Sequence, residues 1–146
     1  MIRRFGEPPR SDKTYTRRAG VYALLPRDGR LLLTSQYEDD PDLQLPGGGI
    51  DLGESPIPAL HREVMEETGW KIATPKWFGS FRRFVFMPEY DLWAEKICHI
   101  YIARPTVCIG APTEADHSAL WMAPEQAAQL LRNPGDRYFA SLLIQT

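Results

Sequence analysis

The hydrophobic and polar positions divide the chain into segments with the repeat of a strand and segments with the repeat of a helix. Four apolar runs rich in aromatic and β-branched residues are predicted to be strands, and they cover residues 19–25, 31–36, 77–87 and 96–103. A charged turn at residues 27–30 separates the first two runs and predicts a hairpin.

Shorter apolar segments and helical repeats complete the pattern. Residues 43–45 form a short apolar segment, and residues 120–122 are predicted to be a short strand. Apolar residues recur at helical spacing in residues 56–68, 124–132 and 137–144. Strands followed by helices in this order predict an α/β fold with a mixed β-sheet between helices.

The helix at residues 56–68 is the best defined element of the sequence. Ile57, Leu60 and Val64 give it an apolar stripe at helical spacing. Ser55 is the expected N-cap, with a proline at the first helical position, and Gly69 is the expected C-terminal stop.

The N-terminal segment has neither repeat. We therefore expect residues 1–16 to form an arm and residues 17–146 to form a single domain, a length that can bury one core. No stretch approaches the roughly 20 apolar residues that span a bilayer, so neither a membrane span nor a membrane partner is expected. The basic N-terminus lacks the apolar segment of a secretory signal, which favours a cytoplasmic location. Cys98 and Cys108 fit core thiols there.

The overall charge limits the class of partner. A net charge of −2 and a pI near 5.9 argue against broad binding to a nucleic-acid backbone. A small anionic substrate remains compatible with this charge if a divalent cation or a few arginines offset the repulsion from the acidic side chains.

Three carboxylates gather on one face of the helix at residues 56–68. At ~100° per residue, Glu63, Glu66 and Glu67 form one stripe about a quarter turn from the apolar stripe. Like charges at this spacing repel each other by tenths of a kcal/mol per pair, so a cation is expected beside them. Oxygen ligands without cysteine or imidazole suit Mg²⁺, for which Mn²⁺ could substitute.

Neighbouring residues fit a supporting role for this stripe. Arg62 can reach along the helix to Glu66 or back to Glu54, which would fix a carboxylate in place. The glycines before the helix allow a sharp turn and a close approach of backbone groups to a metal or phosphate.

Residues 48–70 resemble the Nudix box, Gly-x5-Glu-x7-Arg-Glu-U-x-Glu-Glu-x-Gly-U, in which U is a bulky apolar residue. Each fixed position is matched, and Trp70 at the last position is bulkier than the usual aliphatic residue. The segment at residues 45–48 and Trp121 followed by a helix also resemble the family. The resemblance extends from residue 17 to about residue 143.

The resemblance implies a Nudix-type α/β/α sandwich that hydrolyses a nucleoside diphosphate linked to another moiety. It implies that Glu66 and Glu67 are metal ligands and that the Gly47 carbonyl adds a ligand. Glu63 would be a further ligand or the general base, and Glu54 would pair with Arg62.

A loop acid outside the box is the alternative general base or an additional metal ligand. Many relatives place such a residue in the loop that here contains Glu114 and Asp116, and Asp116 is favoured because His117 follows it.

Four other side chains are candidates for substrate binding. They are basic or aromatic residues in or beside the predicted strands: Arg17, Arg18, Tyr37 and Arg82. Alternation along a strand sends Arg82 and Arg83 to opposite faces, so at most one of the two can face a cleft.

Three functions are consistent with the sequence. The first is a MutT-like nucleotide pyrophosphohydrolase with a small-molecule substrate and no nucleic-acid partner. The second is a hydrolase of dinucleoside polyphosphates or diphosphoinositol polyphosphates, which the pair Arg17–Arg18 would suit. The third is an inactive nucleotide-binding sensor module, although such modules usually lack a box carboxylate and here none is missing. The sequence is compatible with a homodimer.

Overall fold

The computed structural model describes residues 2–37 and 42–144. Its strands and helices, in chain order, are β1 Arg3–Arg4, β2 Thr16–Leu24, β3 Pro26–Arg27, β4 Arg30–Gln36, β5 Asp42–Gln44, β6 Gly47–Gly49, α1 Pro56–Thr68, β7 Trp70–Met87, the 3₁₀ turn η1 Pro88–Tyr90, β8 Leu92–Cys108, β9 His117–Met122, α2 Pro124–Leu130 and α3 Pro134–Ser141.

The strands form two sheets. The larger has the order β1-β7-β8-β2-β6 and is mixed, because β1 runs parallel to β7 and β2 parallel to β8 while the other neighbours are antiparallel. In the smaller sheet, β4 pairs antiparallel with β3, β5 and β9. The predicted α/β fold with a mixed sheet is confirmed.

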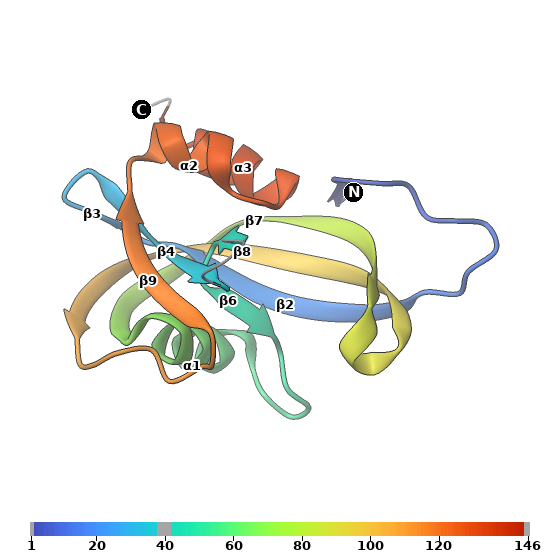
Figure 1. The fold of residues 1–146 in the computed structure, drawn as a ribbon, viewed down its shortest axis with the longest axis horizontal. Coiled ribbons are helices and arrows are strands. Elements are labelled where there is room, and N and C mark those ends of the chain that lie inside the picture. The colour runs from blue at the N-terminus through green and yellow to red at the C-terminus, as the bar shows by residue number, and fades with distance from the viewer. Residues whose placement is uncertain (1, 38–41, 145–146) are drawn as a thin grey trace.

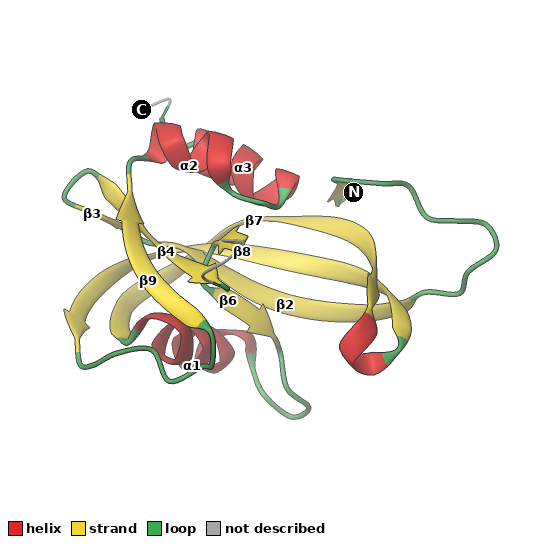
Figure 2. Cartoon of the chain, viewed as in Figure 1, coloured by secondary structure: helices red, strands yellow, loops and turns green. Residues whose placement is uncertain are grey.

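Helices cover both sides of the strands. Figures 1 and 2 show α1 on one side and α2 with α3 on the other. The core under α2 and α3 contains buried residues such as Leu24, Phe81 and Phe139. The core under α1 contains Val21, Leu60 and Val64. This layering is the predicted α/β/α sandwich.

The predicted hairpin between residues 19–25 and 31–36 is wrong for most of its length. Strand β2 pairs with β8 and β6, whereas β4 belongs to the other sheet. Only the two-residue β3 pairs with the start of β4, around a turn in which Asp28 and Gly29 both have positive φ. The turn was predicted correctly, but it determines the pairing only of the strand residues directly next to it.

Other elements begin or end away from their predicted limits. Strands β7 and β8 are longer than residues 77–87 and 96–103, and register shifts interrupt their pairing. Helix α3 begins at Pro134, because the Asn133 side chain accepts a hydrogen bond from the Gly135 amide at 2.9 Å and caps it.

The N-terminal arm also differs in part from its prediction. Its strand β1 pairs with β7, and the Phe5 ring lies 5.5 Å from the ring of Phe81. Within the described residues, no helix has both the length and the apolar character needed to cross a membrane.

Candidate active site

The glycine strand β6 brings the chain close to helix α1. A Cβ on Gly47 would lie 2.1 Å from the Val21 carbonyl oxygen, and φ at Gly47 is +153°, so only glycine fits this position. A Cβ on Gly48 would lie 2.6 Å from the Glu63 carboxyl carbon. The glycines therefore allow the carboxylates of α1 to approach the backbone of the sheet.

Helix α1 has the predicted limits. Ser55 occupies the N-cap position, although within the described chain its side chain makes no capping hydrogen bond. Gly69 ends the helix with φ +78°, and its amide donates to the Met65 carbonyl. The Glu66 carbonyl accepts hydrogen bonds from two amides of the loop before β9, those of Thr113 and Glu114, each at 2.8 Å. This loop is thus held against the C-terminal end of the acidic helix.

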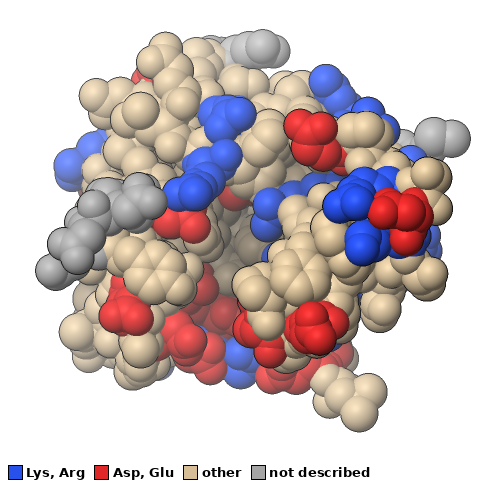
Figure 3. Space-filling view, turned by 45° about the vertical axis from the view of Figure 1, so that its right-hand side comes forward, with Lys and Arg blue, Asp and Glu red and all other residues tan. Residues whose placement is uncertain are grey.

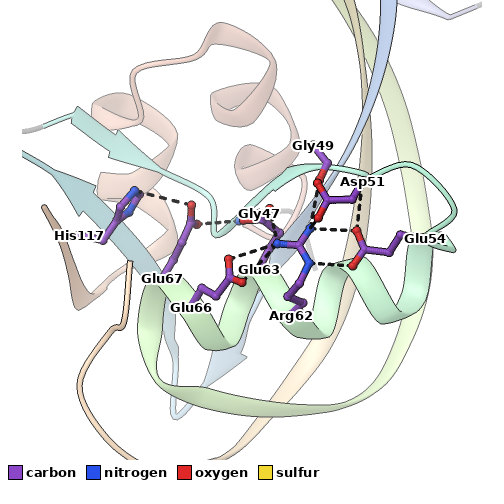
Figure 4. A network of polar contacts seen from close by, with 9 residues as sticks. All are labelled: Gly47, Gly49, Asp51, Glu54, Arg62, Glu63, Glu66, Glu67 and His117. Atoms are coloured by element: carbon purple, nitrogen blue, oxygen red, sulfur yellow. Dashed lines mark hydrogen bonds and ion pairs between the residues drawn. The ribbon is translucent and has the colours of Figure 1, made fainter. Parts of the chain in front are cut away.

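Arg62 stands at the centre of a network of carboxylates (Figure 4). Its Nε and Nη2 donate to the two Glu54 oxygens at 2.7 and 2.9 Å. Its Nη1 donates to Glu63 at 3.1 Å and to Glu66 at 3.2 Å, and its Nη2 also donates to the Gly49 carbonyl at 3.3 Å. The hydrogen bond to Arg62 lowers the pKa of Glu54 to about 2. The predicted contacts of Arg62 with Glu54 and Glu66 are present, and its positioning role stays a prediction.

Glu67 is buried at the site, and Glu63 beside it is half-buried. Glu67 is 6% exposed, and its Oε1 accepts a hydrogen bond from the Gly47 amide at 2.9 Å. Burial raises the pKa of Glu67 to about 8, and it also raises the pKa of Glu63. Buried carboxylates are costly unless a positive charge compensates them.

The donor set fits a hard divalent cation. It consists of carboxylate oxygens on α1 beside a backbone turn of glycines, and it contains no thiolate. In residues 2–37 and 42–144, no three His, Cys, Asp or Glu side chains already converge as a complete cation site. Glu63 and Glu66 turn toward Arg62, while Glu67 turns toward Gly47.

His117 is a contact of the site that the sequence left undetermined. Its Nε2 lies 3.8 Å from Glu67 Oε2, and its Nδ1 lies 2.8 Å from the Thr34 hydroxyl. Burial lowers the pKa of His117 and so favours the neutral ring. The sequence signal was the Asp-His pair at the start of β9.

The two loop acids differ in their relation to the box. The Glu114 amide donates to the Glu66 carbonyl at 2.8 Å, and the charge of Glu114 contributes to the raised pKa of both Glu63 and Glu67. Asp116 is exposed, has φ +65° and acts electrostatically on His117. The metal-ligand role of Asp116 stays a prediction, and Glu114 is the loop acid closer to the carboxylates of α1.

A groove leads from the glycines of β6 across the larger sheet. A pocket of about 210 Å³ lies among Gly49, Arg18 and Tyr90. It shares Tyr22, Glu89 and Lys96 with a cavity of about 390 Å³ that extends to α3. Figure 3 shows a hollowed face with basic side chains around the depression and acidic side chains below it. A volume of this size suits a small organic ligand.

Three cations line this groove side by side. Lys96 on β8 is in register with Arg18 on β2 and with Arg83 on β7, and residues in register point to the same face. All three line the pockets of the groove. The predicted contact of Arg18 with substrate stays a prediction.

Arg17 and Arg82 lie on the opposite face of the sheet. Both pair with Glu95, at 3.0 and 3.3 Å, and line a smaller depression. Their predicted contact with substrate in the groove is therefore not supported. Arg83 lines the groove and Arg82 does not, because successive residues of a strand face opposite sides.

Tyr37 lies next to the loop before β9. It is 54% exposed with φ +64°, and its amide donates to the Asp116 carbonyl at 3.1 Å. Its predicted contact with substrate stays a prediction.

Comparison with known proteins identifies the family. The family model described as NUDIX domain matches residues 14–143. The chain belongs to the NUDIX family. The resemblance read from residues 48–70 is thereby confirmed.

Two curated relatives are similar over most of this domain. An RNA pyrophosphohydrolase of Ruthia magnifica subsp. Calyptogena magnifica is 36% identical over 100 residues, covering 64% of this chain and 49% of the relative. A CTP pyrophosphohydrolase of Escherichia coli (strain K12) is 30% identical over 120 residues, covering 80% and 83%. The chain spans about half the length, between 49% and 58%, of several curated relatives that it matches.

A solved structure of the family has the same fold as this NUDIX chain. A MutT protein from Bacillus halodurans superposes with a TM-score of 0.72 at 19% identity, covering 88% of this chain and 83% of that one. At this identity the likeness shows the fold alone.

Proposed function

We propose that this NUDIX chain hydrolyses a phosphoanhydride bond in a nucleoside diphosphate linked to another moiety, with Mg²⁺ as the cation. One observation carries the proposal. The carboxylate stripe of α1 meets the glycines of β6 at one end of a groove whose floor is the row Arg18, Lys96 and Arg83. Carboxylates for a cation and cations for phosphates are the two requirements of this reaction.

In this proposal the chain's own residues divide the chemistry among them. Glu66, Glu67 and the Gly47 carbonyl would hold Mg²⁺, which polarises phosphoryl oxygens and lowers the pKa of water that it binds. Glu63 would accept the proton of the attacking water, since burial raises the pKa of its carboxyl group. Arg62 would keep Glu63 and Glu66 in place.

A nucleoside triphosphate is the first substrate to test. One relative is named for CTP, which is a nucleoside triphosphate. The alternative substrates, dinucleoside and diphosphoinositol polyphosphates, were suggested by the pair Arg17–Arg18. Arg17 pairs with Glu95 on the other face, so only Arg18 supports that alternative.

A panel of substrates tests the proposal directly. Nucleoside triphosphates, oxidised guanine nucleotides, dinucleoside polyphosphates and diphosphoinositols would be incubated with Mg²⁺, and released phosphate and pyrophosphate would be measured. Glu66→Gln and Glu67→Gln should each reduce kcat by at least ~10²-fold, because each removes a charge from the cation site. His61→Gln, on the exposed side of the same helix, is the matched control and should keep full activity.

Two outcomes would contradict the hydrolase. Full activity of both glutamine variants would show that these carboxylates do not hold the catalytic cation. Tight nucleotide binding without turnover of any substrate, with or without Mg²⁺, would instead indicate the inactive sensor module.

A further inference from the structure

The N-terminal arm packs at the place where α3 meets β7. Figure 1 shows the N-terminal end of the chain beside α3, although almost the whole sequence separates the two. Strand β1 pairs in parallel with β7, and the Phe5 amide donates to the Arg82 carbonyl at 3.0 Å. The Phe5 ring lies 5.5 Å from the ring of Phe81 on β7 and 5.4 Å from the ring of Tyr138 on α3. Phe5 therefore contacts both elements at once.

The Arg3 guanidinium adds to this contact. Its Cζ lies 4.5 Å from the centre of the Phe5 ring and 4.8 Å from the centre of the Tyr138 ring. A guanidinium is attracted to the face of an aromatic ring, so Arg3 favours the position in which both rings lie beside it. Arg4 lies between Arg3 and Phe5, and successive side chains of a strand point to opposite sides. Arg3 and Phe5 are thus the arm residues that face α3.

The arm is anchored at a second place, at the start of β8. The Arg10 Cζ and the Lys13 Nζ lie 5.3 and 5.2 Å from the centre of the Trp93 ring. Between the two anchors the chain contains Pro8–Pro9. Proline restricts the backbone, so this span has fewer alternative conformations to lose when the arm is in place.

The contact that Phe5 makes lies beside one wall of the groove. A Cβ on Gly135 of α3 would lie 2.4 Å from the Phe81 ring, so the start of this helix rests on the ring. The two neighbours of Gly135, Pro134 and Asp136, line the cavity of about 390 Å³. The arm and this wall of the cavity therefore meet at the same residue, Phe81.

Helix α3 depends on such contacts for its position. It has eight residues, and a helix of this length is not stable by itself in water. Phe139 points into the core and stacks on the Phe81 ring, whereas Tyr138 points outward and is 37% exposed. Phe5 and Arg3 contact Tyr138 on this outer side. The arm therefore supplies contacts on the side of the helix that faces away from the core.

We propose that the N-terminal arm is a clasp that holds α3 against β7, and that Arg3 and Phe5 are positioning residues for substrate binding in the groove. In the described structure neither residue lines the groove, so both act through Phe81 and Tyr138. Release of the arm would loosen the wall at α3 and weaken binding, while the carboxylates of α1 would stay in place. The inference rests on the proposed function, because it takes the groove to hold the nucleotide substrate.

Hydrogen exchange measured by mass spectrometry tests the clasp without turnover. In Phe5→Ala the amides of α3 should exchange at least ~10-fold faster than in the wild type, and those of α1 less than ~3-fold faster. Arg3→Ala, which removes an exposed side chain and leaves the core intact, should speed exchange in α3 by at least ~3-fold. The control Arg4→Ala, on the same strand, should change neither helix. Unchanged exchange in α3, or an equal rise in both helices, would overturn the inference.

The division of effects between KM and kcat tests the link from the arm to the groove. On the nucleoside triphosphate that the wild type hydrolyses best, Phe5→Ala should raise KM by at least ~5-fold and change kcat by less than about twofold. Phe5→Tyr keeps the ring and should restore the wild-type KM. Ile72→Val removes a methylene from the core under α1, so it lowers stability without affecting the arm and should leave KM unchanged. A rise in KM of the same size in Ile72→Val would overturn the inference.

The two measurements separate this inference from the proposed function. Faster exchange confined to α3 in Phe5→Ala, in a chain that hydrolyses no substrate, would contradict only the hydrolase proposal. Hydrolysis by the wild type together with an unchanged KM in Phe5→Ala would contradict only the positioning role of the arm.

Discussion

Replacing Gly48 by alanine tests whether the Glu63 carboxylate must lie where the structure places it. The new Cβ would lie 2.6 Å from the Glu63 carboxyl carbon and 2.7 Å from each of its oxygens, whereas ordinary contacts begin near 3.4 Å. The carboxylate would have to retreat by roughly 0.8 Å, and its 3.1 Å hydrogen bond from Arg62 would be disturbed. A displacement near 1 Å of a group that takes part in the chemistry costs on the order of 10²-fold in rate.

We therefore expect kcat of Gly48→Ala to fall by about 10- to 100-fold on the best nucleoside triphosphate. Stability should change by less than about 1 kcal/mol, because the displaced atoms belong to the end of a flexible side chain. Phosphate release and a thermal melt measure the two effects. Gly110→Ala is the control, since in the described structure no atom lies within 4 Å of a Cβ at that position and the residue does not line the groove. Unchanged kcat in Gly48→Ala would refute the role of Glu63 and would make Glu114 the first candidate for the proton acceptor.

Three further variants follow from the same structure. Arg62→Ala should lower kcat more than Arg62→Lys does. In the wild type, the depressed pKa of Glu54 should stabilise the fold above about pH 4.5, and this stabilisation should be lost as pH falls toward 2. Acid unfolding of the wild type and of Arg62→Ala, measured side by side, would show this loss. The folded-state pKa of Asp136 is raised from 3.8 to about 7, so its ionisation opposes folding. The thermal stability of the wild type should therefore fall relative to that of Asp136→Asn as pH rises from about 4 to 7, and melting temperatures that stay parallel over this range would contradict the expectation. Gly135→Ala should destabilise the fold by about 1–3 kcal/mol, because the added methyl would overlap an aromatic ring of β7. A Cβ at Gly110 meets no described atom within 4 Å, so the control Gly110→Ala should unfold in denaturant like the wild type.

The carboxylate helix could be predicted from the sequence because its determinants are local. The proline at its start, its C-terminal glycine and its apolar spacing lie within the helix or beside it, and the limits of α1 agree with the prediction. Arg62 could be assigned to Glu54 and Glu66 for the same reason, since the three residues lie within twelve positions of each other. Side chains three or four residues apart on one helix are neighbours because of the helix geometry alone.

The groove could not be predicted because it depends on contacts between distant segments. Strand β2 pairs with β8 across more than seventy residues, and no local pattern specifies that partner. Alternation predicted that Arg82 and Arg83 face opposite sides, but only the finished sheet determines which side holds the groove. The start of α3 was missed because Asn133, Pro134 and Gly135 have the composition of a loop as well as of a capped helix start.

The arrangement of charge explains how a chain with a net charge of −2 can bind a polyanion. Glu63, Glu66 and Glu67 lie on α1, whereas Arg18, Lys96 and Arg83 come from three neighbouring strands and line the groove together with Asp42, Glu89 and Asp136. The carboxylates of α1 thus lie on a different element from these three cations and do not neutralise them by direct pairing. The separation also predicts a division of kinetic effects. Changes to Arg83 should act mainly on KM, because the contact is made equally with substrate and transition state, and changes to the carboxylates of α1 should act mainly on kcat.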